Sequence, residues 1–330
     1  MSGEALYSVA RAESSVLPQT QLIRGLHNIR AIHQGGVLSI GNFDGVHLGH
    51  RQVLRRLVAE AKHRNTCSIV MLFEPQPQEF FGRMTLHRLS RFREKWQQLR
   101  KTGVDYVLCV RFDRNFSDLS AEDFVQRVLQ GALKTRYVMV GEDFHFGAKR
   151  QGDFAFLQQM GEQYGFDVVA AETFQMGGER VSSTRIRALM QQGDLSAATV
   201  LLGQAYRLYG RVRHGKKLGR QLGFPTANLA LCRKCSPLQG VLAVTVRGVG
   251  DSLLYGVASL GSRPTVSGSE VLLEVYLFDF NEDIYGAHLE VIFHHYLRQE
   301  CRFETLDDMV VQIRQDVIQA KDFFREHEII

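Results

Sequence analysis

The chain has 330 residues, of which 45% are hydrophobic and 23% charged, and a length beyond that of one ordinary hydrophobic core predicts two domains. Because no apolar run of about 18 residues and no signal-peptide pattern occurs, the composition argues against membrane insertion and secretion and favours a cytoplasmic protein. The formal net charge of +5 at pH 7 suits anionic partners, but the basic residues are scattered, which disfavours nucleic-acid binding and leaves nucleotides and phosphorylated small molecules.

Residues 1–20 lack periodicity and are expected to form a loosely ordered extension. Residues 21–204 alternate short apolar runs with helical patterns, which is typical of a parallel sheet covered by helices. One such helix is expected directly after His50, and two more at 183–192 and 194–202. The predicted strands are Val37–Ile40, Ser68–Phe73, Tyr106–Arg111, Tyr137–Val140 and Asp167–Ala171.

The pattern changes near residue 205, so a second domain is expected over 205–330. Its short strands are separated by Gly or Pro, which predicts an antiparallel barrel or sandwich. A closing helix is expected after Thr305, which forms a capping-box pattern with Asp308. The predicted strands are Tyr206–Arg213, Val241–Arg247, Leu253–Leu260, Val271–Phe278 and Leu289–Tyr296, and the apolar stripe of the helix is Leu306, Met309, Val310, Ile313, Val317 and Phe324.

The strongest local signal is the string GNFDGVHLGH at residues 41–50, between the first predicted strand and the first predicted helix. Its glycines let backbone approach a ligand closely. His47 and His50 stand near a helix N-terminus, where unpaired N–H groups and the helix dipole favour anions. The string therefore predicts a polyphosphate site, although the two histidines also fit an ordinary strand-to-helix turn in which they cap or pack.

The spacing of His47 and His50 resembles the HxGH signature of the nucleotidylyltransferase superfamily. The longer string resembles the adenylyltransferase module of bacterial bifunctional riboflavin kinase/FAD synthetases, and three further strings agree: MLFEPQPQEFF at 71–81, VGEDFHFG at 140–147 and RVSSTRIR at 180–187. This resemblance covers nearly all of residues 22–330. It implies a Rossmann-like nucleotidylyltransferase domain that transfers AMP from ATP to FMN, making FAD and releasing pyrophosphate.

The chemistry of that reaction explains the residue types. An FMN phosphate is anionic and can attack the α-phosphorus without a general base, so the site has to neutralise charge and align the groups. The resemblance assigns His47 and His50 to the ATP phosphates and the departing pyrophosphate. The other expected nucleotide contacts are Gly41, Asn42, Phe43, Asp44, Gly45, Asp143, Arg180, Ser183, Thr184 and Arg187.

Three positions of this domain, Asp143, His145 and Gln76, bear on where its ligands bind. Asp143 follows a predicted strand and would lie at the carboxyl edge of the sheet, where open α/β folds bind ligands, although it also fits a turn carboxylate. His145 stands where the family usually shows Arg, and Gln76 where many members show His, so flavin contacts are left unassigned at both positions. The 21 phenylalanines are assigned chiefly to the core.

A second motif, GRQLGFPTANL, occupies residues 219–229. Thr226 and Asn228 lie two apart in an extended segment, so their oxygen atoms share one face, and such ligands suit Mg²⁺ held jointly with nucleotide phosphates. From the residues alone a plain loop is the alternative. The string resembles the PTAN motif of riboflavin kinases, which are small antiparallel barrels, and no Walker-type phosphate loop occurs.

The resemblance to riboflavin kinases implies roles for several residues. Thr226 and Asn228 would bind Mg²⁺ with ATP, and the loop over the nucleotide would contain Gly215, Gly219 and Arg220.

Phosphorylation of riboflavin starts from a neutral hydroxyl, so a base becomes useful. In the strand LLEVYLF (272–278) the lone carboxylate is Glu274, and partial burial would raise its pKa towards that of a competent base. The catalytic Glu of the family falls at this place, although a solvent-facing strand glutamate is the alternative. Arg298 matches a family segment that packs over the flavin, and a surface arginine is the alternative there.

The sequence thus predicts a bifunctional enzyme whose ligands are riboflavin, FMN, FAD, ATP and Mg²⁺, with no nucleic acid, membrane or obligate protein partner. One alternative is a protein in which only one of the two activities still works, and the presence of the expected site residues argues against it. A second is a nucleotide-dependent RNA-binding or regulatory protein that reuses the fold, and the lack of a dense basic patch argues against that.

Overall fold

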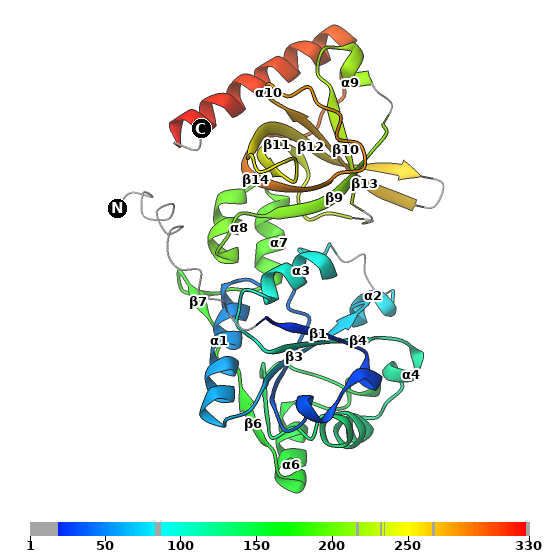
Figure 1. The fold of residues 1–330 in the computed structure, drawn as a ribbon, viewed down its shortest axis with the longest axis vertical. Helices are drawn as coiled ribbons and strands as arrows, with labels where there is room; N and C mark the ends of the chain where they lie inside the picture. Colours follow the sequence, from blue (N-terminus) through cyan, green and yellow to red (C-terminus); the bar gives the residue numbers. More distant parts are fainter. Residues whose placement is uncertain are drawn as a thin grey trace.

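The computed structural model describes residues 19–82, 87–215, 218–231, 233, 235–265 and 268–327. It forms an α/β lobe and a barrel lobe, stacked along the long axis of the molecule (Figure 1). The predicted extension lies almost wholly outside the described residues. In the described part of the chain, no helix is long and apolar enough to cross a membrane.

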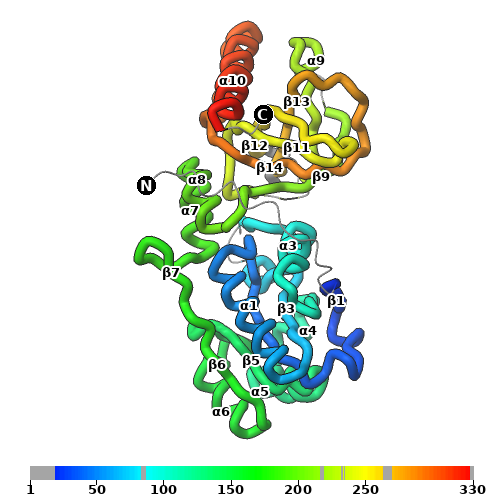
Figure 2. Tube along the Cα trace, turned by 60° about the vertical axis from the view of Figure 1, so that its left-hand side comes forward, coloured from blue at the N-terminus to red at the C-terminus, as the bar shows by residue number. Residues whose placement is uncertain are grey.

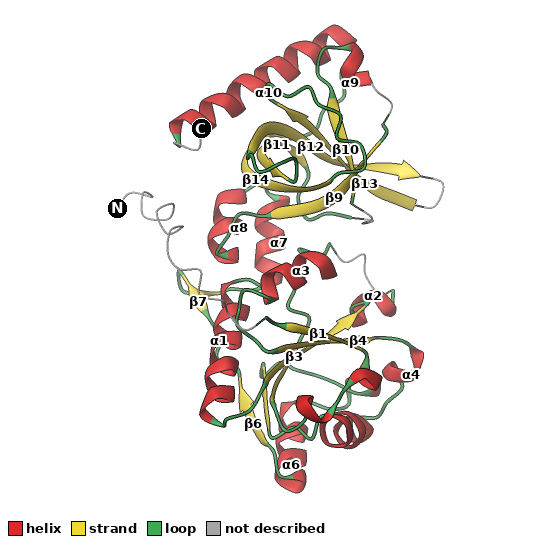
Figure 3. Cartoon of the chain, in the orientation of Figure 1, coloured by secondary structure: helices red, strands yellow, loops and turns green. Residues whose placement is uncertain are grey.

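The α/β lobe is built on a six-stranded sheet in which all neighbouring strands run parallel. Two of its inner strands, Val37–Ile40 and Tyr137–Val140, are buried along their whole length because helices cover both faces of the sheet (Figure 3). An edge strand, β1, was not predicted, since it offers only four residues of which one is buried. The strand order is β1-β4-β3-β2-β5-β6, with bounds β1 Gln21–Arg24, β2 Val37–Ile40, β3 Ser68–Glu74, β4 Tyr106–Arg111, β5 Tyr137–Val140 and β6 Asp167–Ala170.

The strand order places a topological switch point between β2 and β5. The chain moves from β2 to β3 and β4 on one side, then returns to β5 and β6 on the other, so the loops after β2 and β5 diverge at the carboxyl edge. Open α/β sheets bind ligands in this crevice. The surrounding helical elements are η2 Leu26–Asn28, η3 Ala31–His33, α1 Leu48–His63, α2 Pro77–Phe80, α3 Phe92–Leu99, α4 Arg114–Ser117, α5 Ala121–Asp123, η4 Phe124–Ala132, η5 Ala148–Arg150 and α6 Phe154–Tyr164.

The barrel lobe is a closed antiparallel barrel with strand order β10-β13-β12-β11-β14-β9. Along each strand, alternate residues fill the barrel interior, as Leu229, Leu273 and Val275 do. The expected fold class is confirmed in both lobes. The bounds are β9 Arg207–Arg213, α9 Leu218–Gln221, β10 Thr226–Ala230, β11 Gly240–Arg247, β12 Leu254–Thr265, β13 Gly268–Leu277 and β14 His288–Arg298.

The closing helix α10, Leu306–Glu326, lies against the outer surface of the barrel (Figure 2). Thr305 caps it by accepting the Asp308 N–H at 3.1 Å, as predicted. Its C-terminal half packs on β11 and β12 through Phe324 and Ala320. Leu306, at the first helical position, is 54% exposed and does not belong to the packed stripe.

Two helices between the lobes hold them together (Figure 1). These are α7, Ser183–Gln191, and α8, Leu195–Leu202, and they follow the short hairpin of β7, Gln175–Met176, and β8, Glu179–Arg180. The buried side chains of α7 and α8 belong to the same apolar cluster as the barrel interior. The predicted boundary near residue 205 is therefore spanned by a shared core.

Candidate active sites

The turn between β2 and α1 has an unusual backbone. Phe43, Gly45 and Val46 have φ values of 45°, 82° and 42°, in the left-handed region that glycine tolerates best. Phe43 and Val46 adopt this conformation with buried side chains, 4% and 0% exposed. Burial of these side chains anchors the turn, and such strained backbone is typical of functional sites.

His47 and His50 lie at the start of α1 with their rings stacked, 3.6 Å between centroids and 20° between planes. His47 caps the helix, because its Nδ1 accepts the His50 N–H at 3.4 Å, so the proton of the neutral ring sits on Nε2. His50 Nδ1 is buried and has no hydrogen-bond partner in the structure. The capping interpretation is therefore right for His47, and both rings still offer a polar atom to a ligand.

Both imidazoles are held neutral. Burial lowers the pKa of His47 to about 4, against the opposing attraction of Asp44. Burial, followed by repulsion from His47 and Lys95, lowers the pKa of His50 well below its ordinary value. The two rings thus act as hydrogen-bond donors at neutral pH. The positive charge that the sequence predicts around the ATP phosphates must therefore come from other groups.

Asp44 fastens the turn to the chain after α2. Its carboxylate is 3% exposed and accepts the N–H groups of Leu89 and Ser90 at 3.0 and 2.9 Å. Arg187 Nη2 donates to it at 2.5 Å. Although burial disfavours its charge, Lys95 and Arg187 lower the pKa of Asp44 below the ordinary value. The side chain of Asp44 thus serves to hold the turn inside the protein.

The start of α7 lies against the same turn. Ser183 Oγ donates to the Asp44 carbonyl at 2.9 Å, and Arg187 Nε donates to the His87 carbonyl at 2.8 Å. Thr184, in the first turn of the helix, is exposed. The structure thus places the predicted residues of α7 beside the turn after β2, with a helix N-terminus facing the site.

Asp143 and Arg180 meet in front of this turn. Arg180 Nη2 donates to Asp143 Oδ2 at 3.2 Å, and both side chains are more than half exposed. Asp143 follows β5, so it lies at the switch point as expected. His145 is exposed next to it and contacts the Asp143 carbonyl at 2.9 Å. An exposed guanidinium at this place can meet an anionic ligand.

Two features of this site were not predicted from the sequence. Lys95 on α3 is completely buried, and its Nζ donates to the Asn42 carbonyl at 2.5 Å. Burial lowers the pKa of Lys95 and Asp44 opposes this. A lysine among polar helix residues carries no signal of burial, so only the tertiary structure reveals it.

The second feature is an aromatic wall at the carboxyl ends of β3 and β4. Its five rings contact one another with centroids 5.3–5.9 Å apart. Phe81 is 47% exposed, and the nearby Gln76 is buried with an unpartnered Nε2. The wall consists of Phe73, Phe80, Phe81, Phe112 and Phe116.

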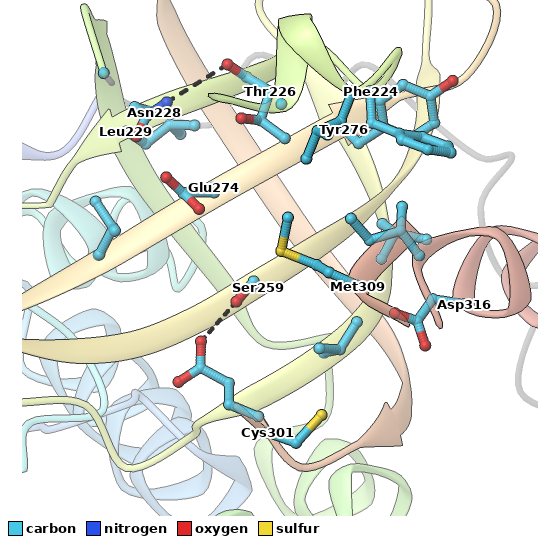
Figure 4. A pocket seen from close by; sticks show the side chains of 18 of the residues that line it. Phe224, Thr226, Asn228, Leu229, Ser259, Glu274, Tyr276, Cys301, Met309 and Asp316 are labelled. Atoms are coloured by element: carbon cyan, nitrogen blue, oxygen red, sulfur yellow. Dashed lines mark hydrogen bonds between the residues drawn. The ribbon is translucent and has the colours of Figure 1, made fainter. Parts of the chain in front are cut away.

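The barrel lobe contains a cavity of about 880 Å³ between its outer surface, the closing helix and the segment before that helix (Figure 4). Strand pairing builds one belt of residues along this cavity, because directly paired residues share a face of the sheet. The belt consists, from β9 round to β14, of Arg213, Asn228, Glu274, Ser259, Val241 and Arg298.

The PTAN segment forms strand β10 and lines this cavity. Thr226 and Asn228 share the outer face, as predicted, and Asn228 is the direct partner of Glu274 on β13. Figure 4 shows the three side chains around one space. Glu274 is partly buried there, and the alternative of a fully solvent-facing carboxylate does not hold.

Two predicted glycines keep the loop before β10 close to it. A Cβ on Gly215 would stand 2.4 Å from the Asn228 side chain, and one on Gly219 would stand 2.3 Å from the Phe224 carbonyl. Position 219 therefore requires glycine, and a larger residue at position 215 would displace the Asn228 side chain or the loop. Arg220 is exposed and borders a neighbouring hollow of about 90 Å³ that Thr226 also lines.

Arg298 lines the cavity and also ties β14 to the closing helix. Its Nε and Nη2 both donate to Asp316 at 2.8 Å, and Asp316 is 2% exposed. Beside it, Ser259 Oγ donates to Glu300 at 2.6 Å (Figure 4). Arg298 is thus not a plain surface arginine, and its pairing with Asp316 fixes the helix over the cavity.

Comparisons with known proteins find relatives of both lobes. The family model described as FAD synthetase matches residues 29–185, and that described as riboflavin kinase matches residues 202–324. A bifunctional riboflavin kinase/FMN adenylyltransferase of Escherichia coli is 49% identical over 92% of this chain and 98% of its own length. One from Haemophilus influenzae is 48% identical over 92% of this chain and 99% of its own.

One solved structure matches across both lobes. The crystal structure of a protein called a macrolide-efflux protein, from Streptococcus pneumoniae, aligns with a TM-score of 0.75 at 29% identity. The alignment covers 90% of this chain and 97% of that one.

Proposed function

The chain belongs to the family of bifunctional riboflavin kinases/FMN adenylyltransferases, and from this premise we propose how its two sites divide the work. The enzyme uses ATP to phosphorylate riboflavin to FMN and then to adenylylate FMN to FAD. We assign adenylylation to residues 21–204 and phosphorylation to residues 205–330. The matches of the two family models to separate parts of the chain support this division.

In the adenylylation site, the phosphate of FMN attacks the α-phosphorus of ATP and pyrophosphate leaves. His47 donates its Nε2–H to a phosphate oxygen, and the buried, unpartnered Nδ1 of His50 is the single observation that most strongly supports a polar ligand here. Arg180 and the N-terminus of α7 supply the positive charge that the neutral imidazoles lack. The site aligns the reactants and needs no general base.

The aromatic wall is assigned to the flavin ring of FMN. We call the turn between β2 and α1, residues 41–47, the phosphate turn. The aromatic wall lies at the carboxyl edge, beside the strand that carries this turn, and the half-exposed Phe81 offers a ring face to stack on. The polar Gln76 side chain is buried beside it with an unpartnered amide N–H. These features support binding of a flat heteroaromatic ring with polar edges.

In the phosphorylation site, Glu274 accepts the proton of the riboflavin hydroxyl as it attacks the γ-phosphorus of ATP. Thr226 and Asn228 offer neutral oxygen atoms on one face of β10, a donor set that fits Mg²⁺ shared with nucleotide phosphates. When bound there, Mg²⁺ would neutralise phosphate charge. Gly215 and Gly219 bring the loop backbone over the nucleotide, and Arg298 holds the helix that covers the cavity.

Product analysis tests the proposal directly. The pure protein is incubated with riboflavin, ATP and Mg²⁺, and the flavins are separated by chromatography. We expect FMN to appear first and FAD to follow. FMN without FAD would contradict the adenylylation site, and neither product would contradict both. Because both reactions consume ATP, we also propose that the enzyme acts in the cytoplasm. We further propose that it acts without nucleic acid or an obligate protein partner.

A further inference from the structure

A short segment that follows α2 and runs into α3 joins the phosphate turn to the barrel lobe. We call residues 87–95 the connector. On the turn side, the N–H groups of Leu89 and Ser90 donate to Asp44, and Ser90 Oγ accepts the Gly45 N–H at 2.8 Å. Because these bonds fix both sides of the turn, the geometry of the turn depends on where the connector lies.

On the other side, a buried arginine of the barrel lobe holds the connector. Arg233 Nη2 donates to Glu94 Oε2 at 2.9 Å, and the two side chains are only 5% and 6% exposed. Its Nη1 donates to Tyr206 Oη at 3.1 Å and to the Arg88 carbonyl at 3.5 Å. This fork of contacts suits the planar guanidinium, which has several donors in fixed directions.

Neighbouring residues of α3 carry the two ends of this linkage. Glu94 meets the barrel lobe, and the next residue, Lys95, donates to the Asn42 carbonyl of the turn. A second tie comes from His87, whose Nδ1 donates to the Ser236 carbonyl at 2.9 Å. Figures 1 and 2 show α3 at the end of the α/β lobe that faces the barrel. A displacement of α3 would therefore move the turn that carries the phosphate-binding groups.

We propose that Arg233, although it belongs to the barrel lobe, is a positioning residue for FMN adenylylation. It holds the connector through Glu94, and the connector holds Asp44 and the turn in the conformation that receives the ATP phosphates. This inference rests on the proposed location of adenylylation in the α/β lobe. Its consequence is that the adenylylation site is complete only when the barrel lobe is docked.

The phosphorylation site should not depend on the Arg233 side chain. The contact of this residue with strand β13, which carries Glu274, runs through its backbone, since the Arg233 carbonyl accepts the Val271 N–H at 3.1 Å. A side-chain substitution keeps that bond. The two reactions of one variant therefore report separately on the connector and on the barrel.

The test measures both reactions in the full chain carrying Arg233→Met. We expect the KM for ATP in FMN adenylylation to rise about tenfold, because small displacements of aligned groups cost rate and affinity. The kcat/KM of riboflavin phosphorylation should stay within about twofold of the unsubstituted enzyme. Unchanged adenylylation kinetics would overturn the proposal.

Loss of stability must be separated from loss of position, because Arg233→Met leaves Glu94 buried and unpaired. The double variant Glu94→Gln/Arg233→Met removes both charges and should recover most of the thermal stability while adenylylation stays impaired. Recovery of adenylylation together with stability would show a merely structural role and overturn the proposal. If the single variant does not fold, the double variant alone carries this test.

Two further variants complete the design. Arg207→Met breaks another partly buried ion pair of the same barrel, with Glu290 at 2.8 Å, and should leave adenylylation normal; an equal defect there would overturn the proposal. His50→Ala tests the proposed site itself. If His50→Ala leaves adenylylation intact, the proposed function of the α/β lobe fails, whereas its loss combined with a normal Arg233→Met variant refutes only the positioning role.

Discussion

The two proposed sites handle ATP with different means. In the α/β lobe the groups that we propose to meet phosphate are two neutral imidazoles, an exposed guanidinium and a helix N-terminus, and the carboxylate of Asp44 is turned into the protein. In the barrel lobe they are neutral oxygen atoms beside the carboxylate of Glu274. The difference follows the nucleophile: an FMN phosphate is already an anion, whereas a riboflavin hydroxyl must lose a proton.

The two sites also differ in what fixes their geometry. The belt of the barrel cavity is set by strand pairing, which places Asn228, Glu274 and Ser259 side by side through backbone hydrogen bonds. The phosphate turn is set by side-chain contacts from the connector and α7. We expect a site whose residues are placed by the register of paired strands to tolerate substitutions far from it. A site built by loops should depend on the segments that pack against those loops.

The largest effect is expected from Glu274→Gln. This change keeps the shape of the side chain and removes the base, so riboflavin phosphorylation should fall by about 10²–10⁴-fold. Added FMN should still be converted to FAD at the normal rate, as chromatography would show. Glu270→Gln, on the same strand and at the edge of the same cavity, is the control and should retain phosphorylation. Equal losses in both variants would remove Glu274 from its role as base.

His50→Ala should affect the two reactions in the reverse pattern to Glu274→Gln, because it should impair adenylylation and spare phosphorylation. Loss of a preorganised donor at a phosphate site costs about 10²–10³-fold in kcat, so FAD formation from FMN should fall by that amount while riboflavin is still phosphorylated. Asn228→Ala should give the reverse pattern. Loss of both reactions in a correctly folded single variant would contradict two separate sites.

The sequence predicts much of the fold because its strands are marked locally. Four of the buried strands of the α/β lobe were predicted to within one residue, since each is an apolar run between helical patterns. Glu274 could be found for a related reason: alternation along LLEVYLF turns Leu273 and Val275 inward and leaves one carboxylate on the other face.

What the sequence did not predict depends on tertiary pairing. Lys95, Glu94 and Arg233 are buried charges whose burial is set by partners far along the chain, and in isolation each reads as a surface residue. The aromatic wall was missed because phenylalanines of the wall and of the core look alike in sequence. The neutral state of the two site histidines likewise follows from burial, which no motif records.

A half-buried histidine of the barrel lobe, His294, predicts acid sensitivity. Burial lowers the pKa of His294 to about 4, from an ordinary value of 6.5. Because the unfolded chain binds this proton below about pH 6.5 and the folded chain does not, stability is fully present above that pH and is lost as the pH falls towards 4. Between pH 7 and pH 5 this one group should cost about 2 kcal/mol.

His294→Gln removes that titration and keeps a polar partner for Thr245, which contacts His294 at 2.8 Å. Urea unfolding of the full chain at pH 7 and pH 5 should show a drop in the free energy of unfolding that is smaller by about 2 kcal/mol in the variant. His288→Gln, at an exposed position at the start of the same strand, is the control. An unchanged drop in His294→Gln would mean that this residue is not kept neutral in the fold.

The smallest effects are expected when one glycine from each site is replaced by alanine. A Cβ on Gly215 would stand 2.4 Å from the Asn228 side chain, whereas one on Gly49 would stand 3.3 Å from the His47 ring. Gly215→Ala must therefore displace the Asn228 side chain or the loop, and the kcat/KM of riboflavin phosphorylation should fall about tenfold. Gly49→Ala requires only a slight adjustment, so FMN adenylylation should fall by about twofold or less. If Gly49→Ala is the more damaging of the two, the phosphate turn is packed more rigidly than the belt of the barrel, and the contrast between a site built by loops and a site built by register is wrong.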